Sequence, residues 1–376
     1  MPVRSLAPGG RECRRTLRIP LLILLLAFLP AFVAASVRAA IAASADVPVA
    51  AVRPAIDTVG IRDVEWTDER HDDRIMVMNI FYPAAVADPA VKPTGLPFFT
   101  DLRLYRDAPP AVTATRRPLI MFSHGRGSNG LVYAWLAQYL AARGYIVAAV
   151  NHTRANTYDT SILYLPTRIW QRPRDISLDI TWLTHDPFWS RYIDPGRIGI
   201  AGHSQGGFTA LWVGGAEINP ARFMAYQRHF LKNPMIPRYL RTQMQIGAAP
   251  ALHLHDPRVK AAFAMAPGIV QAFGMDAAGL AKMAIPTYLI VGAFDKQTPP
   301  AENAVFAAKY IPHATLTILP GKIGHEIFTN ECDQEGKDQL PEGCVDMPGV
   351  DRHALHAQIG AAALAFFDRT LAVRTR

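Results

Sequence analysis

Short apolar runs alternate with stretches of helical periodicity along most of this chain. The runs predict buried strands at 75–82, 119–122, 145–150, 197–201, 259–265, 287–291 and 315–319. Apolar positions at helical spacing predict helices at 132–142, 175–183, 301–310 and 352–371. Buried strands that alternate with helices are typical of a mostly parallel sheet covered on both faces. The pattern therefore predicts an α/β architecture.

Three stretches lack this periodicity and are expected to be irregular. Residues 46–59 have the composition of a flexible lead-in, and residues 84–117 form a long loop rich in proline and alanine. Residues 151–170 form a polar loop that carries Tyr158, Tyr164 and Trp170. These aromatic side chains are expected either to form an apolar wall for a ligand or simply to pack.

The N-terminus has the organisation of an export signal. Arg14, Arg15 and Arg18 precede an apolar run at 19–33, and small residues at 43–45 complete an A-x-A cleavage pattern. We therefore expect a signal peptide at 1–45, a mature domain at 46–376, and a periplasmic or secreted protein. An uncleaved membrane anchor and a buried helix are the alternatives. The pair Arg14-Arg15 is also compatible with twin-arginine export.

Removing that segment changes the charge of the chain. The 376 residues carry a formal net charge of +8, and residues 1–45 contribute +5 of it through six arginines and one glutamate. A residual charge of +3 without a Lys/Arg cluster does not indicate a nucleic-acid partner. Half of the residues are hydrophobic, so a sizeable core is expected.

The strand at 197–201 runs into Gly202-His203-Ser204-Gln205-Gly206-Gly207, and a helix-compatible stretch follows at 208–213. A strand, a G-x-S-x-G turn and a helix form the nucleophile elbow of α/β-hydrolases, in which a sharp turn exposes the serine hydroxyl. The sequence thus predicts the α/β-hydrolase fold, with a mostly parallel central sheet and helices on both faces. Residues 216–256 interrupt the alternation and predict a small helical cap insertion over the active site. An ordinary connecting helix with a surface loop is the alternative.

A serine nucleophile requires a base and an acid that orients the base, and in this fold they follow in the order Ser, Asp or Glu, His. Asp295 follows the strand 287–291, and His325 follows the strand 315–319. Ligand sites lie at such carboxyl ends of parallel strands. We therefore expect Ser204, Asp295 and His325 to form a catalytic triad. Asp295 could instead cap the helix that begins near Pro300.

Eleven other histidines compete with His325 for the role of base. His124 precedes the serine, against the expected order, and the side chain of His203 is expected to point away across the elbow. His353 and His356 are expected on the surface of the final helix.

An oxyanion hole needs two backbone N–H donors. The N–H of Gln205, directly after Ser204, is expected to be one of them. The loop 123–128 should supply the other, with Arg126 as the first choice and Gly125 as the next.

Cys13 lies in the predicted signal, which leaves Cys332 and Cys344 in a loop rich in Gly, Pro and Asp. In an exported protein this pair predicts one disulfide, although two unrelated thiols remain possible. Two cysteines without histidines at ligand spacing do not predict a metal site. No cofactor is expected.

The motifs F-S-H-G-R-G, G-H-S-Q-G-G and V-G-A-F-D, with Gly324-His325 in a loop that carries two cysteines, resemble a known branch. Over about residues 60–372 the chain resembles the bacterial dienelactone-hydrolase-like branch of the α/β-hydrolases, which is similar to platelet-activating-factor acetylhydrolases. The resemblance implies a serine esterase of small or acyl esters that uses no cofactor.

The chain departs from that branch at two points. The lipid-mediator acetylhydrolases take their acid from a stretch that corresponds to 264–267 here, which contains no carboxylate, and this favours Asp295. Dienelactone hydrolases proper have a cysteine where Ser204 stands. These departures disfavour the named substrates of both families.

The sequence therefore predicts an exported serine hydrolase that cleaves small-molecule carboxylic esters through an acyl-enzyme. A peptidase or amidase would use the same triad. A membrane-tethered lipase would result if the N-terminal segment stayed uncleaved. A non-catalytic binding protein on this scaffold would require a missing triad member, and none is missing.

Overall fold

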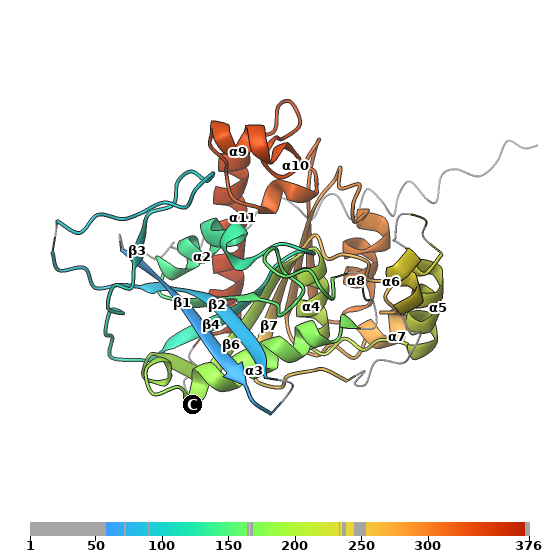
Figure 1. The fold of residues 1–376 in the computed structure, drawn as a ribbon, viewed down its shortest axis with the longest axis horizontal. Coiled ribbons are helices and arrows are strands. Elements are labelled where there is room, and N and C mark those ends of the chain that lie inside the picture. Colours follow the sequence, from blue (N-terminus) through green and yellow to red (C-terminus); the bar gives the residue numbers. More distant parts are fainter. Residues whose placement is uncertain are drawn as a thin grey trace, which may run out of the picture. The chain divides into compact units, whose positions relative to one another are not determined.

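The computed structural model describes residues 58–372, except 71–72, 89, 164, 166–167, 233, 235–237 and 244–252. The predicted signal peptide and most of the lead-in lie outside these residues. The described part contains one nine-stranded sheet with the strand order β3-β1-β2-β5-β4-β6-β7-β8-β9 (Figure 1). From β5 to β9 the neighbouring strands are parallel, whereas β2 is antiparallel to both β1 and β5. The mostly parallel sheet of the prediction is thus confirmed.

The strands are β1 Val59–Asp68, β2 Arg74–Pro83, β3 Leu104–Arg106, β4 Arg117–Ser123, β5 Ile146–Asn151, β6 Ile193–His203, β7 Val259–Met265, β8 Thr287–Gly292 and β9 Ala314–Leu319. All seven predicted strands are present. Two strands were not predicted: β1 follows the lead-in, in a stretch for which no element was predicted, and β3 lies within the predicted loop 84–117. In the middle of β1, half-buried residues alternate with exposed ones, so this strand lacks the continuous apolar run of β4, β5 and β8.

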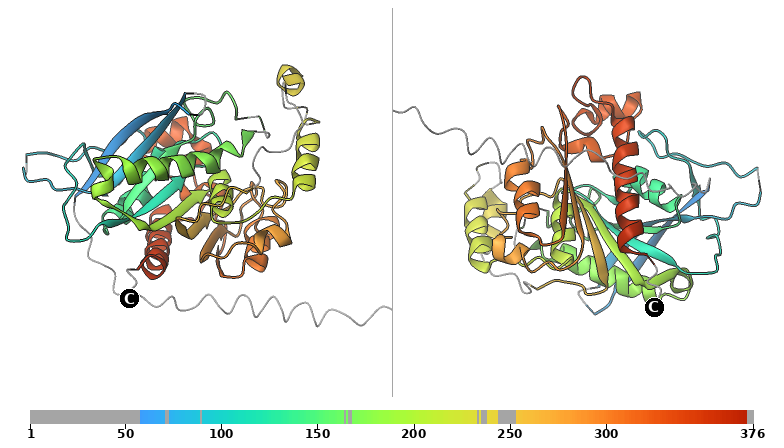
Figure 2. Two further views of the ribbon diagram at one scale, coloured as in Figure 1. Left: turned by 90° about the horizontal axis from the view of Figure 1, so that it is seen from below. Right: turned by 180° about the vertical axis from the view of Figure 1, so that it is seen from behind.

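The α-helices are α2 Ala134–Ala141, α3 Gln171–His185, α4 Gln205–Val213, α5 Pro220–Phe230, α6 Arg238–Gln243, α7 Ala277–Leu280, α8 Ala304–Tyr310, α9 Gln334–Gln339, α10 Pro341–Cys344 and α11 Arg352–Thr370. α2 and α11 pack together on one face of the sheet, and α3 and α4 pack together on the opposite face (Figure 2). The helices therefore cover both faces, as predicted. No helix among the described residues is long and apolar enough to cross a membrane.

α3 begins earlier than predicted, at Gln171 rather than Asp175. Pro173 lies in its first turn, where a missing N–H breaks no helical hydrogen bond. α3 also buries Arg172, Asp175 and Asp179 beside its apolar residues. These buried charges are important for the site described below.

The predicted cap contains two helices, α5 and α6. Asn219 caps α5 by accepting hydrogen bonds from the N–H groups of Ala221 and Arg222 at 3.0 and 3.2 Å. On α5, Tyr226 packs against Phe273 with ring centroids 4.4 Å apart. Residues 244–252 of the predicted cap lie outside the described residues, and its role as a cap stays a prediction.

The expectation that His353 and His356 both lie on the surface is correct only for His353. The side chain of His356 is 7% exposed and stacks on Trp135, with ring centroids 3.8 Å apart. His356 lies on the face of α11 that packs toward α2, so its ring is buried between the two helices.

Candidate active site

The turn between β6 and α4 has the geometry of a nucleophile elbow. Ser204 adopts φ 55° and ψ −120°, a conformation that L-residues rarely occupy. A Cβ at Gly206 would collide with the carbonyl of Ser123, and one at Gly202 would collide with the carbonyl of Gly206. Only glycine therefore fits on either side of the serine, and the strained turn presents a partly exposed Ser204 at the carboxyl end of the sheet.

Asp295 and His325 meet at the same end of the sheet. Asp295 follows β8 and His325 begins a 3₁₀ turn after β9. His325 Nδ1 lies 2.7 Å from Asp295 Oδ2, and the two side chains are 4% and 0% exposed. A carboxylate only accepts, so the imidazole carries its hydrogen on Nδ1 and leaves Nε2 with a lone pair. This is the tautomer that a general base requires.

The carboxylate of Asp295 is fixed from its other side. Its Oδ1 accepts the N–H groups of Gln297 and Thr298 at 2.9 and 2.8 Å, and its Oδ2 accepts the Thr298 hydroxyl at 2.8 Å. Asp295 thus closes a local turn rather than capping the helical turn that begins at Pro300, whose N-cap is Pro299. The position of the acid is set by three donors in addition to the histidine.

Ser204 and His325 line one cavity of about 490 Å³, together with Gly125, Arg126, His203 and Glu326. Within the described part of the chain, no hydrogen bond joins the Ser204 hydroxyl to His325. Catalytic hydrogen bonds of this kind are often long before substrate binds and shorten in the reacting complex. The cavity is large enough for a small organic substrate.

His203 lies beside His325, which differs from the expectation that its side chain points away. The two rings are 4.6 Å apart, and His203 Nε2 lies 3.1 Å from the His325 carbonyl oxygen. That oxygen only accepts, so Nε2 donates and Nδ1 accepts from the Tyr133 hydroxyl at 3.0 Å. Burial first, and His325 second, hold the pKa of His203 well below its ordinary value. His203 is therefore a neutral group that supports the loop carrying His325.

The same Tyr133 hydroxyl accepts the N–H of Gly125 at 3.1 Å. Gly125 lies in the loop that was expected to supply the second oxyanion donor. Because its N–H is engaged by Tyr133, Arg126 stays the proposed donor, together with Gln205 at the start of α4. Three hydrogen bonds, through Tyr133 and His203, thus link the loop 123–128 to the loop that carries His325.

A second Ser-His-Asp set lies beneath this site. Ser123 Oγ lies 2.8 Å from His152 Nε2, and His152 Nδ1 lies 3.1 Å from Asp175 Oδ2. Ser123 and His152 are 0% exposed and Asp175 is 1% exposed. Arg74 binds the other oxygen of Asp175 at 2.6 Å. A hydroxyl that solvent cannot reach is a poor candidate for a nucleophile, so this set is better explained as a buried polar network.

The buried network includes Arg172, which the sequence analysis did not single out. Its guanidinium donates to the His124 carbonyl, to Ser123 Oγ at 3.3 Å and to Gln205 Oε1 at 3.5 Å. Burial lowers the pKa of Arg172 to about 9. The sequence shows only that Arg172, Asp175 and Asp179 recur at helical spacing, and the structure shows that this face of α3 is buried. Arg172 therefore connects the end of β4 with the start of α4.

Cys332 and Cys344 form a disulfide, as predicted. Both cysteines, and Gly343 between them, border the cavity that Ser204 and His325 line. The Gly343 carbonyl accepts the Thr329 hydroxyl at 3.2 Å and Arg352 Nη1 at 2.9 Å. The bridged loop thus packs directly on the segment that follows His325.

Arg126 also borders a second cavity, which the predicted cap lines. Tyr226 and Phe230 of α5 line this narrow cavity together with Arg126 and Gln205. Leu163 and Ile169 from the loop 151–170 also line it. The predicted cap and the loop 151–170 therefore meet beside the proposed oxyanion donors.

Comparison with known proteins agrees with this architecture. Residues 104–167 match the family model of platelet-activating factor acetylhydrolase, isoform II. A search of curated proteins finds no match. Among solved structures, a ferulic acid esterase from Streptomyces cinnamoneus is similar, with a TM-score of 0.57 and 22% identity, over 88% of this chain and 93% of that one. The sheet order and the elbow are those of an α/β-hydrolase fold, and over residues 104–167 the chain resembles the platelet-activating-factor acetylhydrolases.

Proposed function

We propose that this protein is a serine hydrolase that cleaves small-molecule carboxylic esters, with Ser204 as nucleophile, His325 as base and Asp295 as the orienting acid. The observation that carries the proposal is the buried pair His325–Asp295, 2.7 Å apart, on the same cavity as a serine held at φ 55°. These groups occupy three neighbouring loops in the chain order typical of the fold.

In the proposed reaction, His325 Nε2 takes the Ser204 proton while the serine oxygen attacks the ester carbonyl. The negative charge that develops on the carbonyl oxygen is stabilised by the N–H groups of Gln205 and Arg126. His325 then gives the proton to the departing alcohol, which leaves an acyl-enzyme. Water, activated by the same imidazole, hydrolyses that intermediate and restores the serine.

The ester rather than the amide class is proposed because the matched family and the similar solved structure carry the names of ester hydrolases. A peptidase or amidase with the same triad is the alternative, since a triad alone does not select the leaving group. Export to the periplasm or the medium is proposed from the predicted signal and is supported by the disulfide. An uncleaved N-terminal segment would tether the enzyme to a membrane.

The test follows hydrolysis of p-nitrophenyl acetate and butyrate together with labelling by a fluorophosphonate probe. Ser204→Ala is expected to abolish both while the circular dichroism spectrum stays that of the wild type. Ser190→Ala is a matched control, because its side chain makes no hydrogen bond with the residues that the structure describes and lies on a turn before β6.

Peptide mass spectrometry locates the probe adduct. An adduct on the peptide of Ser204 supports the proposal. An adduct on Ser123, or turnover retained in Ser204→Ala, refutes it. An unlabelled and inactive wild type would favour a binding protein on this scaffold.

A further inference from the structure

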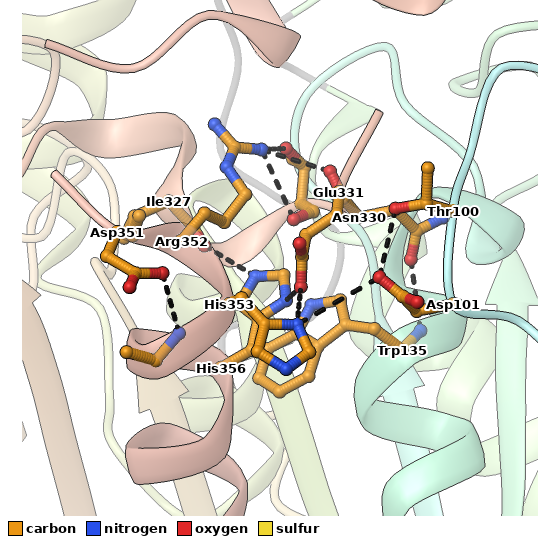
Figure 3. Close-up of polar contacts among 12 residues, drawn as sticks. Thr100, Asp101, Trp135, Ile327, Asn330, Glu331, Asp351, Arg352, His353 and His356 are labelled. Atoms are coloured by element: carbon orange, nitrogen blue, oxygen red, sulfur yellow. Dashed lines mark hydrogen bonds and ion pairs between the residues drawn. The ribbon is translucent and has the colours of Figure 1, made fainter. Parts of the chain in front are cut away.

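A polar cluster outside the proposed active site joins three distant segments of the chain. His353 and His356 lie on α11, Glu331 precedes the bridged Cys332, and Asp101 lies in the loop before β3 (Figure 3). His353 Nδ1 lies 3.0 Å from Glu331 Oε1 and 3.9 Å from Asp101 Oδ2. His356 Nδ1 lies 3.7 Å from the same Glu331 oxygen. Both imidazoles thus converge on one carboxylate.

The protonation of His356 follows from its partners. Its Nε2 lies 2.9 Å from the Ile327 carbonyl oxygen, which only accepts, so the hydrogen is on Nε2. With that hydrogen on Nε2, the Nδ1 atom of the neutral ring carries a lone pair.

That lone pair faces the Glu331 carboxylate, which is also an acceptor. No donor among the described residues forms a hydrogen bond with His356 Nδ1. His353 Nδ1 lies within hydrogen-bond distance of Glu331, but a hydrogen on that atom does not lie between Glu331 and His356. Two acceptors that face each other repel unless a donor or a cation lies between them, so the space between His356 Nδ1 and the Glu331 oxygen suits a cation.

We propose that Asp101, Glu331, His353 and His356 bind a divalent transition-metal ion of the Zn²⁺ type. Zinc lies about 2.0–2.2 Å from nitrogen and oxygen ligands, so tetrahedral ligands are separated by about 3.4 Å. The three distances of 3.0, 3.7 and 3.9 Å lie on both sides of that value. Two imidazoles and two carboxylates favour such an ion over Ca²⁺ or Mg²⁺, which prefer oxygen ligands alone.

The cluster has a fixed half and a movable half. Glu331 and His356 are 22% and 7% exposed, whereas Asp101 and His353 are 64% and 73% exposed. The ligand atoms of Asp101, Glu331 and His353 already lie within 4.8 Å of one another. Rotation of the two exposed side chains toward the buried pair would complete the coordination shell. The nearby positive charge of Arg352 is offset by Asp346, which it binds at 2.8 Å.

An ion at this site would be structural. It would join the loop before β3 to α11 and to the residue before Cys332. The same His356 ring holds the Ile327 carbonyl, two residues after His325. Metal binding would therefore stabilise the segment that carries the proposed base.

The test uses the full chain without an oligohistidine tag, because such a tag itself binds zinc. After treatment with a chelator, the protein is dialysed against Zn²⁺ and bound metal is counted by elemental mass spectrometry. We expect one saturable equivalent and a higher thermal midpoint with Zn²⁺. His353→Ala and Glu331→Gln are each expected to weaken binding at least about tenfold, since even indirect partners of a metal change its affinity by about 10–100-fold.

His313→Ala is the matched control, because it removes an exposed histidine far from the cluster along the chain, before β9. Its Zn²⁺ affinity should equal that of the wild type. Cobalt provides a second measurement that does not depend on stability: tetrahedral Co²⁺ absorbs strongly in the visible range, and Glu331→Gln should lose this absorption. No saturable Zn²⁺ binding, binding unchanged in both cluster variants, or an equal loss in His313→Ala would overturn the proposal.

Discussion

Replacing Asp295 by asparagine tests the proposed triad with little change in shape. In the wild type, Oδ1 accepts two backbone N–H groups, and Oδ2 accepts His325 Nδ1–H and the Thr298 hydroxyl. In the variant, the asparagine oxygen must face the two backbone N–H groups, because an amide NH₂ cannot accept hydrogen bonds from them. The NH₂ therefore replaces Oδ2 and donates to His325.

That donation reverses the histidine tautomer. Nδ1 becomes an acceptor, the hydrogen moves to Nε2, and Nε2 can no longer take a proton from Ser204. The equivalent exchange in chymotrypsin-type proteases lowers kcat by about ten-thousand-fold. At 1.36 kcal/mol for each factor of ten, this corresponds to about 5 kcal/mol of lost transition-state stabilisation. Thr298 can still donate, since its hydroxyl also lies 3.3 Å from the Ala266 carbonyl.

The assay compares kcat/KM for p-nitrophenyl butyrate between the wild type, Asp295→Asn and Asp276→Asn. Asp276 is a matched control because its carboxylate also closes a turn, accepting the Gly279 N–H at 2.9 Å, but without a histidine partner. We expect a rate within about twofold of the wild type for Asp276→Asn and a fall of about four orders of magnitude for Asp295→Asn. Turnover within tenfold of the wild type in a folded Asp295→Asn would refute the role given to this carboxylate.

Three further predictions concern stability. Tyr133→Phe leaves the Gly125 N–H and His203 Nδ1 without their buried partner, so the free energy of unfolding in urea should fall by about 1–3 kcal/mol; an unchanged value would contradict the link. Replacing Cys332 and Cys344 together by serine should lower the same free energy by about 3 kcal/mol, and a reductant should then have no further effect on the variant. His356 has a folded-state pKa of about 3, so the unfolded chain binds one more proton between about pH 6 and 3 and stability falls with acidification. The pH slope of the unfolding free energy should decrease in His356→Gln by up to about 1.4 kcal/mol per pH unit, and identical slopes would exclude this linkage.

The central strands and the elbow could be predicted from the sequence because they depend on local pattern. β4, β5 and β8 are buried along their whole length, and each contains a continuous apolar run. The elbow at Ser204 requires glycines at fixed positions, which leaves a readable motif. β1 could not be found in this way, because every second residue in its middle faces solvent.

The residues that hold the site in place could not be predicted, because their contacts depend on how distant segments pack against one another. Tyr133 reaches both Gly125 and His203 only because β4 and β6 are parallel neighbours with Ser123 opposite Gly202. Arg172 is polar on a helix, and nothing local indicates that its guanidinium is buried beneath the elbow. His356 was expected on the surface because the sequence does not show that Trp135 packs against its ring.

Three hydrogen bonds run from the Gly125 N–H through Tyr133 and His203 to the His325 carbonyl, and this link has only one possible arrangement of protons. Its first member, the Gly125 N–H, can only donate, and its last, the His325 carbonyl, can only accept. Every intermediate hydrogen is therefore assigned, and the three bond dipoles align head to tail from one loop to the other. A proton added to His203 would have nowhere to go without reversing the Tyr133 hydroxyl and breaking the alignment. The link is thus polarised in one direction, and in the proposed reaction this direction keeps His203 from competing with His325 for the Ser204 proton.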